Sequence, residues 1–232
     1  MNPVRCGHVL LSHGQVAVLA QQEPAVRWPR ALRNLAVRPG RDQPVVPLDD
    51  PLLRPGMLAF ARPLLRVRVV LRQGRLTVLS EVAATAAAAG ALSTLLLPAR
   101  NASGRQPGGG PPTWLRPVGR VELIGAPAAG AAALCLRHVP GAREPAPGAA
   151  EPGSGPDSRP GSRPGLRPAR SLVVRGWGPA LVRPFVDVWA QDEHGWSRPR
   201  PVIGAGGRWE PVDGARFAAE LRAALTCRSV GG

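Results

Sequence analysis

The 232-residue sequence contains no lysine and no tyrosine, and only 4% of its residues are aromatic. All 30 cationic side chains are therefore arginine, a bias that GC-rich coding DNA produces because lysine and tyrosine codons are AT-rich. The absence of lysine excludes a P-loop, which requires that residue. The H-E-x-x-H and G-x-S-x-G motifs are absent too, so neither a zinc peptidase nor a hydrolase nucleophile is indicated.

Cysteine is scarce as well. Cys6, Cys135 and Cys227 are odd in number, far apart and outside any C-x-x-C pattern. The pattern indicates neither a disulfide framework nor a zinc site, and it fits reduced thiols in the cytoplasm. Residues 1–19 hold only one short apolar run, Val9-Leu10-Leu11, and so lack the pattern of a secretory signal. The sequence therefore predicts cytoplasmic localisation.

The formal charge of +15 is unevenly placed along the chain. Residues 1–140 hold 17 arginines against 6 acidic residues, residues 141–170 hold 5 against 3, and residues 171–232 hold 8 against 6. The first segment has the electrostatics to attract nucleic acid, anionic lipid or an acidic protein. A solvated arginine-rich surface that reflects the coding bias is the simpler interpretation.

Local signals predict short elements in the first 63 residues. Ser12 and Gln15 form a capping box, which predicts a helix that stops at Pro24. Proline punctuation predicts a loop over residues 43–55, and an apolar turn of helix over residues 57–61 is predicted to stop at Pro63.

Residues 65–79 give the clearest hairpin pattern, with two alternating runs around Arg72-Gln73-Gly74. Four arginines are predicted to lie on or beside one face of it: Arg66, Arg68, Arg72 and Arg75. We interpret this face as solvent-exposed. A basic binding strip is the alternative, but aromatic side chains that would stack on bases are missing from the face.

Residues 81–97 are rich in alanine and are predicted to form a core or partner-facing helix capped by Ser80. A transmembrane span is the disfavoured alternative, since crossing a bilayer takes roughly 20 strongly apolar residues. Residues 118–124 and 134–139 read as strands. Residues 141–170 are predicted to be a disordered linker, because 13 of these 30 residues are glycine or proline without apolar periodicity.

The C-terminal region combines strand, turn and helix signals. We predict a strand at 185–189, a turn at 192–195, a short strand at 201–203 and an amphipathic helix after Asp213, with Phe217, Leu221 and Leu225 on one face. Another strand is predicted to begin at Ser171. A glycine-rich run, Gly204-Ala205-Gly206-Gly207, follows the short strand, but no helix opens directly after it, so a phosphate site is disfavoured.

Other candidates for chemistry are weak. The four histidines, His8, His13, His138 and His194, show no ligand spacing, and a carboxylate cluster of Asp187, Asp192 and Glu193 is expected to be solvated. Four tryptophans gather in one region: Trp177, Trp189, Trp196 and Trp209. Core packing is the simpler interpretation of them, and an aromatic interaction surface is the alternative.

Four segments, in order, resemble the EspG-like proteins of type VII (ESX) secretion. The first contains Leu11-Ser12, Gln15, Val18-Leu19 and then Trp28-Pro29 with Leu32-Arg33; the second runs from Leu58 to Pro63 and on through Arg66-Val67-Arg68-Val69; the third is Val188-Trp189 to Gly195; and the fourth is Trp209 to Leu221.

The resemblance implies an α+β fold, with a central, mostly antiparallel sheet flanked by helices in two pseudo-equivalent halves. These halves would be residues 1–140 and 171–232 of one domain, separated by the disordered linker 141–170. The resemblance also implies a non-enzymatic cytoplasmic chaperone that binds helical secretion substrates of the PE/PPE or WXG-like type, without membrane insertion.

We assign no catalytic, cofactor-binding or metal-binding residues, and the sequence leaves the partner-binding residues unknown. Two alternative hypotheses stay open. The first is an arginine-rich nucleic-acid-binding protein that uses the basic first half. The second is a poorly folded product of a GC-rich reading frame, against which the mutually consistent capping and hairpin signals argue.

Overall fold

The computed structural model describes residues 5–29, 32, 48, 50–98, 115–142, 169–181, 183–193, 195–200, 208–212, 216, 217 and 219. The elements are β1 (Gly7–Leu11), α1 (His13–Gln22), α3 (Leu53–Leu58), β2 (Leu65–Gln73), β3 (Leu76–Ala84), β4 (Ala88–Pro98), β5 (Leu115–Pro127), the 3-10 helix η1 (Ala128–Gly130), α4 (Ala131–Leu136), β6 (Arg170–Trp177), β7 (Phe185–Asp192), β8 (Gly195–Arg200) and β9 (Arg208–Val212).

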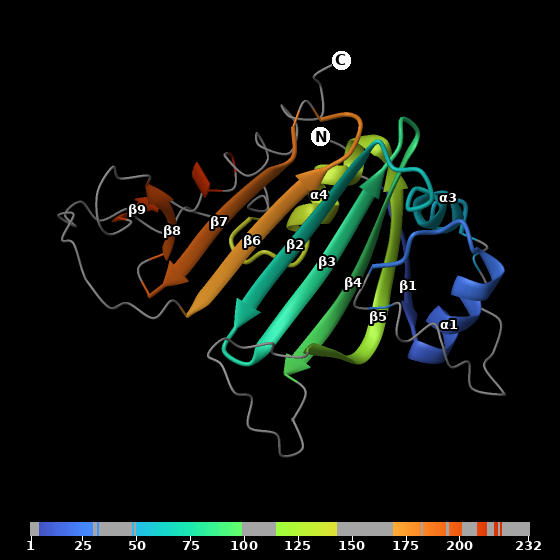
Figure 1. Ribbon diagram of the computed structural model, residues 1–232, viewed down its shortest axis with the longest axis horizontal. Coiled ribbons are helices and arrows are strands. Elements are labelled where there is room, and N and C mark those ends of the chain that lie inside the picture. The colour runs from blue at the N-terminus through green and yellow to red at the C-terminus, as the bar shows by residue number, and fades with distance from the viewer. Residues whose placement is uncertain are drawn as a thin grey trace, which may run out of the picture.

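Within these residues, nine strands form a single sheet in the order β1-β5-β4-β3-β2-β6-β7-β8-β9 (Figure 1). Every neighbouring pair is antiparallel. Strand β2 pairs with β3 on one side and with β6 on the other, so strands from before and after residues 143–168 share the sheet. The predicted α+β class and antiparallel sheet are confirmed.

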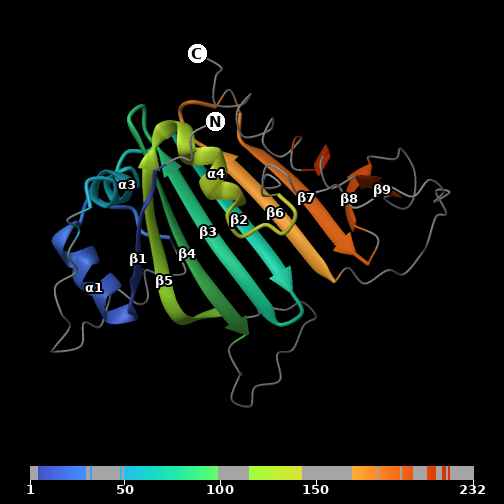
Figure 2. The same ribbon diagram turned by 180° about the vertical axis from the view of Figure 1, so that it is seen from behind.

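The two faces of the sheet carry separate hydrophobic cores. On one face, α1, α3 and the chain around Trp28 pack on Ala83, Leu92 and Leu123. On the opposite face, α4 and the chain that follows it pack on residues of β2, β3 and β6, such as Val67, Val82 and Val174. Figure 2 shows α4 in front of the sheet, with α1 and α3 beside its β1–β5 end.

Helix α3 approaches the sheet backbone to backbone. Gly90 of β4 and Gly125 of β5 are register partners, and Gly56 of α3 lies directly against both. A Cβ atom added to Gly56 would lie 2.6 Å from the Cα atom of Gly125. Since only glycine allows this spacing, the three residues set the seat of α3 on the sheet.

The predicted helix over residues 81–97 is wrong. Residues 76–84 and 88–98 are instead the adjacent strands β3 and β4, joined by a turn in which the Thr85 hydroxyl accepts from the amides of Ala87 and Ala88. Ser80 caps no helix, and its hydroxyl is bonded to that of Ser93 on β4 at 2.9 Å. Small side chains here let α3 and α4 approach the sheet from opposite faces, and this tertiary packing overrides the helix propensity of alanine.

The predicted strand at 134–139 is also wrong, because residues 131–136 form α4. Leu134, Cys135, Leu136 and Val139 are all buried and gather on the sheet through a helical turn, which the short apolar run could not distinguish from a strand. Helix α3 begins at Leu53, so the predicted loop over 43–55 is wrong at its end and the predicted turn of helix lies too late. Pro55 is tolerated in the first turn, where no amide needs an intrahelical acceptor.

Other predictions are confirmed. The Ser12 hydroxyl accepts from the Gln15 amide at 3.1 Å, the Gln15 side chain accepts from the Ser12 amide at 2.8 Å, and α1 ends at Gln22. The hairpin at 65–79, the strand at 118–124, the strand that begins near Ser171 and the strand at 185–189 are present. The 192–195 turn also forms, with Gly195 at a φ of +125°.

Some predicted features lie outside the described residues. These are the short strand at 201–203, the glycine-rich run 204–207, the helix cap Asp213, Leu221, Leu225 and nearly all of the linker 141–170. Arg208 to Val212, to which no element was assigned, form the edge strand β9. Among the helices that the structure describes, none has the length and apolar character needed to cross a membrane.

Candidate functional site

One face of strands β2, β6 and β7 has no described helix packed on it, and this region is the candidate site. In Figure 1 these strands face the viewer, whereas α4 passes behind them. The register and the alternation of side chains place the following eight residues, among others, on this face. They are Arg68, Val70 and Arg72 of β2, Val173, Arg175 and Trp177 of β6, and Val186 and Val188 of β7, and they are called the open face below.

The open face is arranged in cross-strand rows. Val70 pairs with Val173, which in turn pairs with Val188, so three valines form one apolar row. Exposure rises toward β7, where Val188 is 37% exposed and Val186 is 55% exposed. Large aliphatic side chains side by side at such exposure mark a surface that gains free energy when a partner covers it.

Arginines flank the apolar row. Arg68 pairs with Arg175 in the row beside the valines, and Arg72 pairs with Ser171 in the row on the other side. Arg72 and Arg175 are exposed. The face therefore combines an apolar stripe with positive charge, which favours a partner surface that is apolar and acidic.

A buried ion cluster adjoins this face, on the same side of the sheet, at the β2–β3 pair. Glu81 is 1% exposed and accepts from the Nε atom of Arg66 at 3.1 Å and from the Nε atom of Arg68 at 2.8 Å. Arg66 also donates to the carbonyl oxygen of Arg27 at 2.6 Å and lies over the Phe60 ring. The solvent face predicted for the hairpin is thus wrong for Arg66, which is 8% exposed.

Two guanidinium groups share the single carboxylate of Glu81, which leaves an excess positive charge. Arg68 is the more exposed of the two, with a side chain that is 35% exposed against 10% for Arg66. Its guanidinium carbon lies 5.6 Å from the centre of the Trp177 ring. An aromatic side chain does stand beside these arginines, so the predicted lack of one on this face is wrong.

The four tryptophans divide between core and surface. Trp189 and Trp196 are buried against Phe217, with ring centroids 5.0 and 4.5 Å apart, which confirms core packing for these two. Trp177 is half-buried on the open face, and Trp209 on β9 is 47% exposed. Of the four, only Trp177 and Trp209 are exposed enough to contribute to an aromatic interaction surface, which stays a prediction.

Two histidines that are 130 residues apart meet at one carboxylate. The Nε2 atom of His8 lies 2.9 Å and that of His138 lies 2.7 Å from the carboxylate oxygens of Glu122, and Arg137 donates to the same carboxylate at 2.9 Å. This cluster ties the edge strand β1 and the end of α4 to β5. Sequence spacing gave no signal for it, because His8, Glu122 and the adjacent Arg137 and His138 come from three distant parts of the chain.

The Glu122 cluster predicts a specific loss of stability in acid. Burial alone raises the pKa of Glu122, but hydrogen bonds from His138 and Arg137, with their positive charges, outweigh burial and lower the pKa to about 2. A folded-state pKa below the unfolded value stabilises the protein above about pH 4.5, and this contribution is lost as pH falls toward 2. A shift of this size corresponds to about 3 kcal/mol.

We therefore expect Glu122→Gln to lower the free energy of unfolding by about 3 kcal/mol at pH 6, with most of the difference gone near pH 2. Urea titrations of both proteins across this range measure it. Glu23→Gln is the control, because the Arg54–Glu23 pair is long at 3.5 Å and its arginine is 66% exposed, so the change in stability should be under about 1 kcal/mol. A difference that does not vary with pH would contradict the assigned pairing.

The remaining predicted site residues do not converge. The described part of the chain contains no group of three or more His, Cys, Asp or Glu side chains that could hold a metal ion. Asp187 and Asp192 lie on β7 and Glu193 lies in the turn after it.

Comparison with known proteins found no family that matches the sequence and no curated protein that matches it significantly.

Proposed function

We propose that the protein is a non-enzymatic cytoplasmic adaptor or chaperone that binds a helical type VII (ESX) secretion substrate, of the PE/PPE or WXG-like kind, before export. The observation that carries the proposal is the open face, where an uncovered valine row lies between arginines. A helix with one apolar stripe and acidic flanks complements such a surface. The resemblance to EspG-like proteins, and the two pseudo-equivalent halves that it implies, add to this proposal.

Val186, the most exposed valine of the open face, provides the test; it pairs with Arg175 and lies two residues from Val188 on β7. Val186→Asp places a carboxylate where the partner's apolar stripe would lie, and the buried charge should weaken binding at least tenfold, which is about 1.4 kcal/mol. Leu10→Asp is the matched control, because Leu10 is 47% exposed on β1 and lies outside the open face.

The experiment starts with nuclease-treated purification of the tagged protein from its own cells and identification of the bound proteins by mass spectrometry. The dissociation constant of the purified complex is then measured by calorimetry for both variants. A small helical secretion substrate that binds the Leu10→Asp protein normally and the Val186→Asp protein weakly supports the proposal. Equal binding by the two variants would place the partner elsewhere and remove the support of the open face.

A second candidate function is favoured by the contact of Arg68 with Trp177. An aromatic ring beside exposed arginines on an uncovered sheet can stack a base and neutralise a phosphate, as single-strand binding proteins do. Under this alternative, Trp177→Ala weakens binding of a dT20 oligonucleotide by about 1–3 kcal/mol, and affinity falls steeply with salt. Absence of dT20 binding at low salt would leave the protein partner as the sole candidate.

A further inference from the structure

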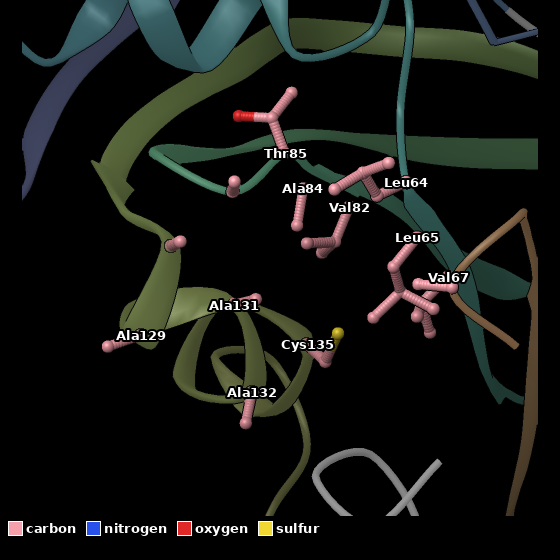
Figure 3. A pocket seen from close by; sticks show the side chains of 13 residues that line it. Leu64, Leu65, Val67, Val82, Ala84, Thr85, Ala129, Ala131, Ala132 and Cys135 are labelled. Carbon is pink, nitrogen blue, oxygen red and sulfur yellow. The ribbon is translucent and has the colours of Figure 1, made fainter. Parts of the chain in front are cut away.

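A pocket of about 290 Å³ lies between α4 and the face of the sheet opposite the open face. Figure 3 shows Leu65, Val82 and Ala84 of the sheet on one side and the side chains of α4 on the other. Seven of its thirteen lining residues are alanines, drawn from β3, the β3–β4 turn, η1, α4 and the chain after β6. The space exists because side chains from five separate segments all stop at Cβ.

The side chains that line this pocket offer no free polar group to a ligand, and Thr85 carries the only hydroxyl among them. The Thr85 hydroxyl is already engaged in the β3–β4 turn, where it donates to the Ala88 carbonyl at 3.2 Å and accepts from the Ala88 amide at 3.1 Å. Cys135 is 3% exposed, and burial raises the pKa of its thiol to about 12, so the sulfur is a neutral, polarisable surface. A polar group placed inside would lose its hydrogen bonds to water and find no side-chain partner to replace them.

The mouth of the pocket is open to solvent. Leu64 at the rim is 43% exposed, and the rim residues Ala86 and Ala129 are exposed as well. A ligand can therefore bury an apolar part and keep a polar end in water. The volume is close to the lower limit of about 300 Å³ for ligand pockets and about twice that of a dry apolar cavity that holds benzene.

From these observations we propose that the pocket binds one aliphatic chain of a small amphiphile, with the polar end at the mouth. The chain would lie among Leu65, Ala84 and Ala131, against the sulfur of Cys135. Contacts with these walls replace those that an unfilled apolar space loses. This site is separate from the open face, so the proposal does not depend on the proposed adaptor function.

Primary alcohols are suitable probes, because they carry no charge that the arginines would attract. In calorimetric titrations of the full chain, octan-1-ol is expected to bind saturably and roughly fifteenfold more tightly than hexan-1-ol, since each buried methylene contributes about fourfold. Ala131→Leu and Ala84→Leu each extend a side chain into the pocket from one of its two facing walls and should weaken octan-1-ol binding at least tenfold. Ala133→Leu is the matched control, because Ala133 is exposed on α4 and does not line the pocket.

Normal octan-1-ol binding by the Ala133→Leu and Val186→Asp proteins, with loss in at least one filled variant that stays folded, supports the proposal. The proposal is overturned if the wild-type protein shows no saturable binding, or if the filled variants bind as tightly as the Ala133→Leu protein. Octanoate serves as a second probe. Binding of octanoate without binding of octan-1-ol would indicate attraction to surface arginines and would likewise overturn the proposal.

Discussion

Replacement of Gly125 by alanine is expected to destabilise the protein by about 3 kcal/mol, although it adds a single methyl group. The added carbon would collide with the Leu52 carbonyl group and lie 2.9 Å from the Cα atom of Leu53. These atoms belong to the backbone at the start of α3, so no side-chain rotation relieves the contact. The helix must move away from β5, and the buried contacts of Leu53 and Met57 with the sheet loosen with it.

Urea denaturation measures this effect as a shift of the midpoint. Gly74→Ala is the control, because a methyl group there meets no atom within 4 Å and only the φ of +56° is unfavourable, which costs about 1 kcal/mol. The two variants separate steric exclusion at α3 from the general cost of replacing glycine. If Gly125→Ala unfolds at the same urea concentration as the wild type, α3 does not sit directly on β5.

Elements whose signals are local could be predicted from the sequence. The Ser12–Gln15 capping box and the hairpin around Gly74 each depend on residues a few positions apart, and both formed as expected. The helix predicted over residues 81–97 is wrong because its conformation depends on contacts that are distant in the sequence. Whether an alanine run becomes helix or strand depends on what packs on it, and here Gly56 of α3 and Leu134 of α4 approach the sheet from opposite faces.

The candidate site could be predicted only in part. Alternation in residues 65–71 correctly placed several arginines on one face, but the sequence did not show that Glu81 would lie directly opposite Arg68. The alanine run predicts a helix that includes Glu81, so the prediction contains no strand that would bring the Glu81 carboxylate beside these arginines. The pairing of β2 with β6 brings Trp177 beside Arg68 across more than 100 residues, a separation over which alternation carries no information.

Loss of the Glu81 carboxylate is expected to have the other large effect, about 3–5 kcal/mol of destabilisation. Glu81→Leu leaves the guanidinium of Arg66 buried without its carboxylate, which is more unfavourable than the loss of the pair itself. Arg68 should contribute less to this cost, because its half-exposed side chain can extend into water. Thermal or urea unfolding gives the free energy.

The double variant Glu81→Leu/Arg66→Met distinguishes ion pairing from packing. If the cost arises from an unpaired buried charge, removal of that charge restores most of the stability, because apolar replacements of a buried ion pair are often neutral. The recovery should be incomplete, since Met cannot donate to the Arg27 carbonyl as Arg66 does at 2.6 Å. A double variant no more stable than Glu81→Leu would mean that the cost does not arise from the unpaired charge of Arg66.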